Sequence, residues 1–374
     1  MKITVSKNEL LGKLRILGKV LQPKNTLPAY DDFLFVIDEN GFLTITAGEE
    51  GGRMLTDIVC RVDCTDLKFT VNARTLLEAL KEIPEQPIVM EIHPTDKCVE
   101  LNCNYSNGKF SLLGKLGMEY PDTPFIDPGF PQVLKVADFL YGIRQVKICC
   151  ANDELRPVMN GVYFDRDLDK ITYVASNGST LAMVERPAAH ISERNSFIIP
   201  ARYAQILASA IPAGCEELSV TVASSNACFE FDNYRLVFRL IEGRYPNYRA
   251  VLPNDNDKEA IVALDSLISA IKRTSVFSNP NSLAVKLSFT DSLLIQVQDI
   301  DYSTSAEETV GLVSYKGANI EIGFRSTYLI ESLSSISSEK VRITMKQVGT
   351  ATIITPEGED NGLLYLIMPM SINF

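Results

Sequence analysis

A strand-then-helix signature recurs six times along this 374-residue chain, at intervals of roughly 60 to 66 residues. Each copy is a short run of β-favouring residues, then a turn or capping residue, then a leucine-rich stretch with helical periodicity. The short runs are Ile3–Val5, Phe69–Val71, Leu134–Val136, Phe197–Ile199, Ile261–Ala263 and Ile320–Ile322. One such unit cannot bury its apolar face alone, so the repeat predicts an assembly of similar units. A chain built in this way is more typical of a scaffold than of a catalyst.

The leucine-rich stretches predict six helices, and the segments between them predict strands. The expected helices span residues 6–21, 72–83, 137–151, 200–211, 264–275 and 323–336. Three strand-like segments follow each even-numbered helix: 88–92, 99–103 and 109–114; then 218–222, 227–231 and 234–241; then 341–345, 351–355 and 363–368. Short runs rich in Gly, Ser and Asn separate these segments and suit hairpins. The sequence therefore predicts an α+β fold.

Two similar tetrapeptides divide the chain into thirds. They are EYPD at 119–122 and RYPN at 244–247, and a link rich in Pro and Asp follows each of them. Pro restricts its own backbone and that of the preceding residue, so such links favour extended crossings between domains. We predict three similar β-rich domains with two helices each, at residues 1–129, 130–253 and 254–374.

The charge of the chain is unevenly distributed. The formal net charge is −11, yet the six expected helices hold twelve basic and six acidic residues, so the rest of the chain carries −17. Basic helices on an acidic body indicate one surface made for a polyanion. Ordinary solvated helix faces explain the same pattern.

The sequence shows none of the common catalytic or cofactor motifs. There is no P-loop, no G-x-G-x-x-G after a strand, no G-x-S-x-G and no H-E-x-x-H, and the two histidines, His93 and His190, have no partner motif. None of the eight cysteines forms a C-x-x-C pair, so the spacings predict no zinc site. With no apolar leader and no stretch of 18 apolar residues, we expect a cytoplasmic protein without a membrane partner.

Six segments of the chain carry a family pattern. They are LQPKNTLPAYDDFLF (21–35), ELRPVMNGVYF (154–164), ASNGSTLAMV (175–184), EGRYPNYRAVLP (242–253), VSYKGANIEIGF (313–324) and YLIMPM (365–370). With these segments the chain resembles the bacterial DNA polymerase III beta subunit family, the sliding clamps. RYPNYRAVLP and MPM are the most specific, and the domains follow the family's order. The resemblance implies the DNA-clamp fold, in which a head-to-tail homodimer of three-domain chains closes into a ring of six similar domains.

The resemblance implies a function as well: a processivity factor that encircles duplex DNA without sequence specificity and has no catalytic activity and no cofactor. Helices would line the hole, and binding would be electrostatic and sensitive to salt. The implied partners are double-stranded DNA, a second copy of the chain, the catalytic subunit of the replicative polymerase, and the clamp loader. Repair polymerases, ligase and mismatch-repair proteins would bind through short peptide motifs.

The resemblance assigns residues to three surfaces. The residues expected to face DNA are Lys13, Lys24, Arg74 and Arg202. The residues expected at the dimer interface are Phe110 and Leu112 on one side and Val276, Phe277, Glu307 and Glu308 on the other. An apolar pair flanked by charge suits an interface core with a polar rim.

The third surface is a hydrophobic pocket for partner peptides between the second and third domains. Its expected lining is Met159, Ser176, Gly178, Thr180, Leu181, Pro246, Val251, Leu366, Met368, Pro369 and Met370. Methionine is adaptable, which suits a groove that receives several peptides, and a motif with Gln and two large apolar residues would anchor there. The plainer interpretation is that Met368 and Met370 only pack a terminal strand.

The chain departs from the family pattern at several positions. Ala250, Ser179-Thr180 and Ser371 replace more basic residues, which predicts a less cationic pocket rim, and the tail SINF (371–374) is longer than usual. Pro157 and Val158 lack the aromatic character of some relatives, so the sequence does not decide whether this loop contacts DNA. The main alternative to a clamp is a repeat-built scaffold that oligomerises without encircling DNA. An enzyme with a site assembled from distant positions is the third alternative.

Overall fold

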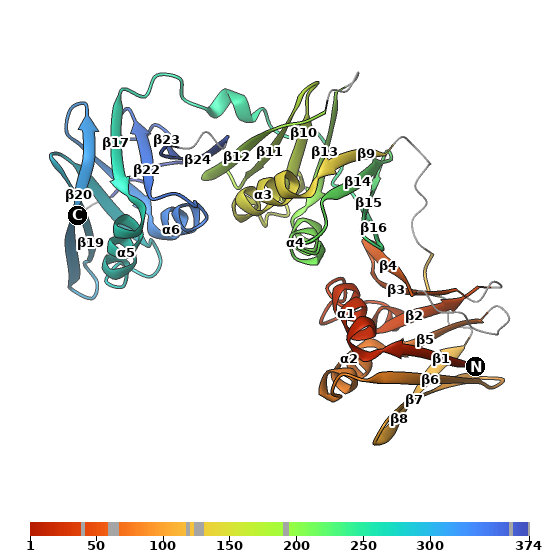
Figure 1. The fold of residues 1–374 in the computed structure, drawn as a ribbon. Coiled ribbons are helices and arrows are strands. Elements are labelled where there is room, and N and C mark those ends of the chain that lie inside the picture. Colours follow the sequence, from red (N-terminus) through yellow and green to blue (C-terminus); the bar gives the residue numbers. More distant parts are fainter. Residues whose placement is uncertain are drawn as a thin grey trace. The chain divides into compact units, whose positions relative to one another are not determined.

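The computed structural model describes residues 1–38, 42–58, 67–116, 120–122, 131–189, 194–358 and 362–372. Within these residues the chain forms six α-helices and 24 strands, arranged as six copies of one motif (Figure 1). Each motif is one strand, one helix and three further strands in chain order. The six-fold repeat expected from the sequence is therefore confirmed.

The first three motifs contain the following elements. The first motif is β1 (Lys2–Ser6), α1 (Lys7–Leu17), β2 (Asp32–Ile37), β3 (Leu43–Glu49) and β4 (Gly52–Ile58). The second is β5 (Leu67–Asn72), α2 (Ala73–Glu82), β6 (Pro87–Pro94), β7 (Cys98–Tyr105) and β8 (Gly108–Leu116). The third is β9 (Gln132–Lys135), α3 (Val136–Val146), β10 (Gly161–Arg166), β11 (Lys170–Ser176) and β12 (Thr180–Pro187).

The last three motifs repeat the same order. The fourth is β13 (Asn195–Pro200), α4 (Ala201–Ala210), β14 (Glu217–Val222), β15 (Asn226–Phe231) and β16 (Tyr234–Arg239). The fifth is β17 (Lys258–Ala263), α5 (Leu264–Ser275), β18 (Ala284–Phe289), β19 (Ser292–Asp299) and β20 (Thr304–Lys316). The sixth is β21 (Ile320–Arg325), α6 (Ser326–Ser334), β22 (Lys340–Met345), β23 (Thr352–Pro356) and β24 (Leu363–Ile367).

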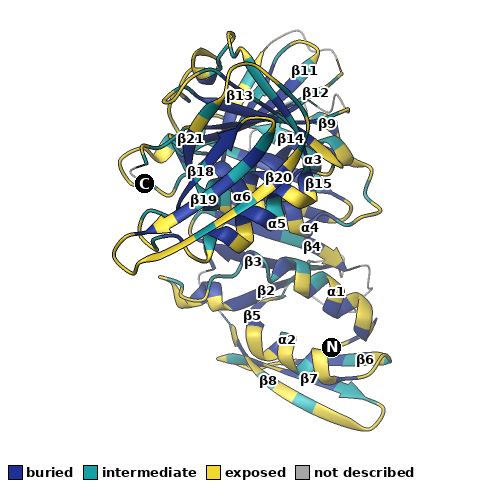
Figure 2. Ribbon diagram, turned by 90° about the vertical axis from the view of Figure 1, so that its left-hand side faces the viewer, coloured by how far each residue is buried: buried dark blue, intermediate teal, exposed yellow. Residues whose placement is uncertain are grey.

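Capping and apolar spacing explain where the helices form. The side chains of Ser6 and Asn72 accept hydrogen bonds from the backbone N–H groups three residues later, at 3.4 and 3.0 Å, and so cap α1 and α2. Leu76 and Leu80 in α2 lie four residues apart and are both buried. In Figure 2 the central strands are mainly buried, whereas the helices retain an exposed face.

Three predicted helix boundaries were wrong by three residues or more. The third helix was expected to reach residue 151, but α3 ends at Val146 and a short 3₁₀ helix, η2 (Lys147–Cys149), follows it. The sixth helix was expected from residue 323, but β21 continues to Arg325 because Gly323 and Phe324 still pair with β18. The first helix was expected to reach residue 21, but it ends at Leu17, where the N–H of Gly18 closes the last turn on the carbonyl of Leu14. The nine strand-like segments named from the sequence all correspond to strands.

Neighbouring motifs exchange their first strands. β1 pairs with β6 of the second motif, and β5 pairs with β2 of the first. The same exchange joins β9 with β14, β13 with β10, β17 with β22 and β21 with β18. Each pair of motifs therefore forms two interlocked four-stranded groups, which explains why a single motif is not a stable unit.

The fourth strands of the motifs join these groups into larger sheets. β4 pairs antiparallel with β16 in a first junction, and β12 pairs antiparallel with β24 in a second junction. With short links from β5 to β8 and from β17 to β20, the described residues form two 12-stranded sheets.

The chain divides into two compact units, and each unit contains one of these sheets. One unit comprises Met1–Val136 and Ile206–Leu240, and the other comprises Ala137–Gln205 and Ile241–Phe374. The division falls within the central third of the sequence. The first junction joins β16, in the second half of that third, to β4 of the first third, and the second junction joins β12, in its first half, to β24 of the last third. The three-domain boundaries at 129/130 and 253/254 remain a prediction, and residues 123–130 lie outside the described part.

Candidate functional site

An apolar cluster lies at the second junction, within the second unit. Its buried members are Val174, Leu181, Ile198, Tyr245, Tyr248, Ala351, Ile353 and Leu366. Leu181 of β12 and Leu366 of β24 are directly opposite each other across the junction. Two residues predicted to line the partner pocket are therefore brought together at its centre.

A tight turn between β11 and β12 forms one side of this site. The Asn177 side-chain oxygen accepts hydrogen bonds from the N–H groups of Ser179 and Thr180, at 2.9 and 2.8 Å. Gly178 has a φ of +91°, which L side chains rarely adopt, and the Ser176 hydroxyl donates to the Thr180 carbonyl at 2.8 Å. The predicted lining residues Ser176, Gly178 and Thr180 thus occupy one rigid turn.

The chain after β24 is held against this turn and against β21. The Met368 N–H donates to the carbonyl of Ser179 at 2.8 Å, and the Met370 N–H donates to the carbonyl of Gly323 at 2.9 Å. A Cβ at position 323 would stand 2.5 Å from Ile372, so only glycine fits beneath the tail. The Met368 side chain remains 39% exposed, whereas Pro369 and Met370 are half-buried. Asn373 and Phe374 of the SINF tail lie outside the described residues.

A short 3₁₀ helix, η4 (Tyr248–Val251), forms another wall. The Tyr245 ring stacks on Tyr163 with centroids 4.7 Å apart, and the Tyr248 hydroxyl donates to the Asp165 carboxylate at 2.8 Å. Burial, followed by this bond to Asp165, raises the pKa of Tyr248 to about 12, so the hydroxyl stays a proton donor. Pro246 and Val251, both predicted lining residues, are exposed on this wall.

Three residues that were not predicted to line the partner pocket also border the apolar cluster. Val158, Tyr163 and Met183 pack against the apolar cluster, whereas the predicted Met159 is buried outside it at the end of η3 (Pro157–Met159). The Arg156 guanidinium lies 3.1 Å from the point where a Cβ on Gly178 would stand, so it borders the turn. The aromatic spacing of RYPNY (244–248) was the available sequence signal for Tyr245 and Tyr248.

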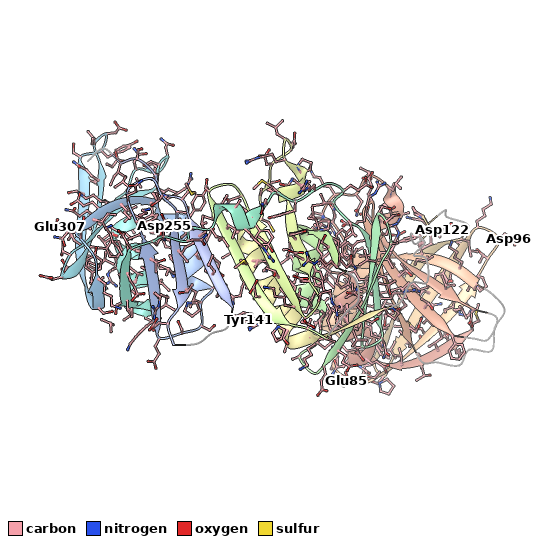
Figure 3. The ribbon with its side chains drawn as sticks, turned by 90° about the horizontal axis from the view of Figure 1, so that it is seen from above. Glu85, Asp96, Asp122, Tyr141, Asp255 and Glu307 are labelled. Carbon is pink, nitrogen blue, oxygen red and sulfur yellow. The ribbon has the colours of Figure 1, made fainter. Side chains whose placement is uncertain are left out.

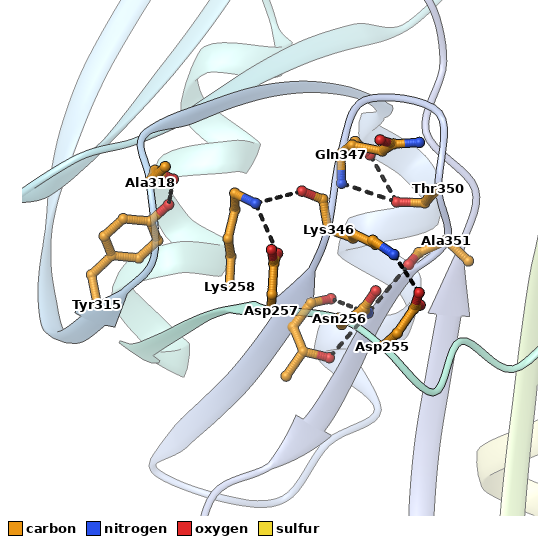
Figure 4. A network of polar contacts seen from close by, with 11 residues as sticks. Asp255, Asn256, Asp257, Lys258, Tyr315, Ala318, Lys346, Gln347, Thr350 and Ala351 are labelled. Carbon is orange, nitrogen blue, oxygen red and sulfur yellow. Dashed lines mark hydrogen bonds and ion pairs between the residues drawn. The ribbon is translucent and has the colours of Figure 1, made fainter.

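Hydrogen bonds and an ion pair from residues 255–258, at the start of β17, hold the side of the site that contains Ala351 (Figure 4). The Asn256 amide donates to the carbonyls of Thr344 and Ala351, at 3.1 and 3.4 Å. Lys258 donates to the carbonyl of Lys346 at 2.7 Å, and Lys346 forms an ion pair with Asp255. Because Ala351 belongs to the apolar cluster, this network positions that side of the site.

Beneath the site, one buried tyrosine connects three elements. The single hydroxyl proton of Tyr365 in β24 is shared between the backbone and side-chain oxygens of Gln145 in α3, which lie 3.0 and 2.9 Å from the hydroxyl oxygen. The Tyr365 hydroxyl also contacts the hydroxyl of Ser335, the C-cap residue of α6, at 2.5 Å. These polar groups are satisfied by one another, which holds the second junction in a single arrangement.

The first junction carries a different side chain at the matching position. Arg53 of β4 is opposite Val237 of β16, as Leu181 is opposite Leu366. Arg53 is only 4% exposed, and its guanidinium lies 4.5 Å from the Tyr30 ring centroid and donates to the carbonyl of Gly52 at 2.9 Å. The position of Leu181 at the second junction is thus taken at the first junction by Arg53, a buried charged side chain that contacts Tyr30 and Gly52.

Two of the residues predicted to face DNA lie next to each other. Lys24 is exposed in the segment after α1, and Arg74 of α2 donates to the carbonyl of the adjacent Pro23 at 3.0 Å. Lys13 of α1 donates to the carbonyl of Asp57 at 2.9 Å, so its ammonium is tied to the end of β4. Arg202 is exposed at the start of α4, which places it in the other unit.

Three other basic residues counted in the charge of the expected helices are buried or form hydrogen bonds within the chain. Lys19 donates to the carbonyl of Ser209, and burial lowers the pKa of its ammonium. Lys147 donates to Gln205, and Lys7 is buried. The charge available to a polyanion is therefore smaller than the sequence count indicates.

Four of the predicted dimer-interface residues lie on two strands that each have an open edge: Phe110 and Leu112 on β8, and Glu307 and Glu308 on β20. β8 pairs with β7 along its length but contacts β5 only at Lys115 and Leu116, and β20 pairs only with β19 from Thr304 to Gly311 among the described residues. Both strands are mainly exposed or half-buried (Figure 2). Glu307 lies at the margin of its unit (Figure 3).

Exposed apolar side chains accompany the β20 edge. Val276 and Phe277, just after α5, are 77% and 46% exposed, and the Thr304 hydroxyl donates to the carbonyl of Phe277 at 3.2 Å. Glu308 is engaged by Arg273 of its own chain, which lowers the pKa of the carboxyl. On β8, Phe110 and Leu112 are half-buried.

The described residues show no assembled reactive centre of the kinds sought from the sequence. No group of three or more His, Cys, Asp or Glu side chains in the described part is placed to hold a metal ion. Burial raises the pKa of Cys149 and Cys150 to about 12, so both are protonated thiols at neutral pH. Cys60, Cys64 and His190 lie outside the described residues. No described helix has the length and apolar character needed to cross a membrane.

Comparison with known proteins gives a consistent result along the whole chain. Models of the three domains of the DNA polymerase III beta subunit match in order: the N-terminal domain at residues 1–124, the central domain at 133–247 and the C-terminal domain at 249–371. The beta sliding clamp of Escherichia coli K12 is 24% identical over 373 residues, and that of Vibrio cholerae is 22% identical over 372 residues. Both alignments cover 100% of each chain.

Solved structures agree with the fold. The DNA polymerase sliding clamp of Bacillus subtilis superposes with a TM-score of 0.90 at 20% identity, and a Pseudomonas aeruginosa sliding clamp bound to griselimycin superposes with a TM-score of 0.91 at 23% identity. Both comparisons cover 100% of each chain. At this identity the likeness establishes the three-domain architecture along the full length of the chain.

Proposed function

Because the chain belongs to the DNA polymerase III beta subunit family, we propose that it is a DNA sliding clamp: a non-catalytic ring that encircles duplex DNA and tethers the replicative polymerase. It requires no cofactor, and it acts in the cytoplasm. Its partners are double-stranded DNA, a second copy of itself, the clamp loader, the polymerase catalytic subunit, and repair polymerases, ligase and mismatch-repair proteins.

The ring is inferred from the pairing of the fourth strand of each motif. Six motifs supply six fourth strands, and four of them pair with each other at the two junctions inside the chain. The remaining two, β8 and β20, each keep an open edge among the described residues. β8 of one copy joining β20 of the next is a heterologous contact, and two such contacts close a head-to-tail dimer. Closure also covers two edges that would otherwise invite aggregation.

The DNA surface comprises Lys13, Lys24, Arg74 and Arg202. Lys24 is exposed and Arg74 holds the adjacent backbone, so this pair presents positive charge from an ordered loop. Cations that contact phosphates without reading base edges give binding that is independent of sequence and weakens steeply with salt. A ring held in this way slides because no base contact must be broken.

The partner pocket is the apolar cluster with its rim. Leu181 and Leu366 form the floor, and the exposed Val251 and Met368 leave apolar surface for a ligand. Such a site fits a short peptide with two large apolar side chains, and the polar turn at 176–180 supplies groups for a Gln side chain. Ala250 and Ser371 at the rim carry no charge, so peptides with apolar anchors are preferred over acidic ones.

Processive synthesis by the polymerase of the same organism tests this function. On a singly primed circular template with its clamp loader, addition of the chain is expected to lengthen the products of a single binding event at least about tenfold, because tethering replaces rebinding from solution. A variant with Leu366→Asp is the matched control for the pocket and is expected to give short products. Products of unchanged length with the unmodified chain would favour the scaffold interpretation.

A further inference from the structure

We propose that the first junction contains a second site built like the partner pocket, and that the side chain of Arg53 keeps this first-junction site closed. The proposal rests on the peptide binding proposed above, and the ligand class is the same: a short peptide with two large apolar side chains. It follows that each chain offers one open pocket, and that Arg53 determines this number.

The backbone is arranged alike at the two junctions. β4 pairs with β16 as β12 pairs with β24, with the first residue of each strand opposite the fifth residue of its partner. At the first junction the Arg239 N–H donates to the carbonyl of Gly51 at 2.9 Å, and at the second the Met368 N–H donates to the carbonyl of Ser179 at 2.8 Å. Both junctions thus present the same backbone frame.

The walls of the two junctions correspond as well. A 3₁₀ helix that begins with proline precedes β2 at the first junction, η1 (Pro28–Asp31), and β10 at the second, η3 (Pro157–Met159). A buried tyrosine followed by proline belongs to the apolar cluster at each junction, Tyr120 at the first and Tyr245 at the second. The strand pair, the 3₁₀ helix and the tyrosine of the partner pocket therefore all have counterparts at the first junction.

The side chain that faces these walls differs between the junctions. At the first junction the Arg53 guanidinium lies 4.5 Å from the ring centroid of Tyr30 and 5.9 Å from that of Tyr120. It donates to the Tyr30 hydroxyl and to the carbonyls of Glu49 and Gly52. Arg53 therefore covers the aromatic wall of the first-junction site, whereas a leucine stands at this position in the second junction.

The rim differs in the same sense. Arg239 corresponds to Met368 by its backbone hydrogen bond, and its side chain is exposed. Positive charge thus stands at the first junction where the second offers the apolar surface of Met368, which is 39% exposed. A peptide with apolar anchors binds neither the floor nor the rim of the first-junction site while both arginines are present.

Stability does not account for an arginine at position 53. The side chain is 4% exposed, and its hydrogen bonds to described residues end on neutral oxygens. Burying a cation among neutral acceptors costs free energy, which the two aromatic rings offset only in part. An apolar side chain of similar size avoids this cost, so the arginine is better explained by the ligand that it excludes.

Replacing Arg53 in a chain whose partner pocket is disabled tests the proposal. Leu366→Asp disables the partner pocket, and the chain with R53L, R239M and L366D is expected to regain one bound peptide. Its affinity for a synthetic polymerase-derived peptide is expected to be at least about tenfold higher than that of L366D alone, because two aromatic rings become accessible. R53K with R239M and L366D retains the cation and is the matched control, which is expected to show no gain.

Calorimetry measures affinity and stoichiometry, and circular dichroism verifies the fold. A peptide with a photoreactive benzophenone group locates the new site by mass spectrometry, with attachment expected near Tyr30 and Tyr120. With the partner pocket intact, R53L with R239M is expected to bind two peptides per chain and the unmodified chain one.

Two results would overturn the closed site: a folded R53L and R239M variant that gains no peptide, or an unmodified chain that binds two. Unfolding of that variant would do the same, because it would assign Arg53 a purely stabilising role. No binding by the unmodified chain would instead contradict the peptide-binding function itself.

Discussion

Replacing Phe110 and Phe277 together by alanine is expected to convert the dimer into a folded monomer. Phe277 is 46% exposed in the single chain and Phe110 is half-buried, so neither supports the interior of its own unit as a core residue does. Apolar anchors at an interface centre contribute about 2 kcal/mol or more each, and the ring contains two seams. With two anchors at each of two seams, the total loss is about 8 kcal/mol, which corresponds to a dissociation constant roughly a million-fold higher.

Sedimentation at micromolar concentration measures this change, and circular dichroism verifies that the monomer is folded. Phe42→Ala is the matched control, because Phe42 is 54% exposed but lies at neither open edge. A double variant that remains dimeric at nanomolar concentration would show that these residues do not form the seam.

Deleting residues 368–374 is expected to abolish binding of polymerase-derived peptides without opening the ring. The deletion removes Met368, which is exposed beside the apolar cluster, and the backbone bonds that tie the tail to Ser179 and Gly323. β24 itself ends at Ile367, so its pairing with β12 is retained. Loss of one wall of a peptide site is expected to weaken binding at least about 100-fold, equivalent to about 3 kcal/mol.

Calorimetry with a synthetic peptide measures the affinity, and sedimentation reports the dimer. Deleting only Asn373 and Phe374 is the control and is expected to leave the affinity within about twofold, because it retains Met368 and the backbone bonds that tie the tail to Ser179 and Gly323. Unchanged affinity after the longer deletion would refute the assignment of the pocket to this end of the chain.

The repeat made most of the fold predictable. Leucines at helical spacing and caps such as Ser6 and Asn72 are local signals, and the helices they predicted were found with small errors at the ends. Gly323 was wrongly assigned to the sixth helix because glycine signals a boundary, whereas its place in β21 depends on pairing with β18 and on the tail above it. Tertiary contacts of this kind leave little trace in local sequence.

The junctions were less predictable than the motifs. Alternation in a strand indicates which side chains are buried but does not indicate which strand lies alongside, so the pairing of β4 with β16 could not be derived. Arg53 is the clearest case: its charge suggests exposure, yet it is buried against Tyr30, 23 residues earlier in the chain. The peptide-site residues Leu181 and Leu366 were identified from the family resemblance, whereas Val158 and Tyr163 required the three-dimensional arrangement.

Retention on DNA is the most direct test of an encircling ring. The chain is loaded on nicked circular DNA by its clamp loader, freed of unbound protein, and measured again after the circle is cut. We expect retention on the circle and rapid loss from the linear form, because a ring slides off a free end. Equal retention on circular and linear DNA would contradict encirclement and indicate ordinary surface binding.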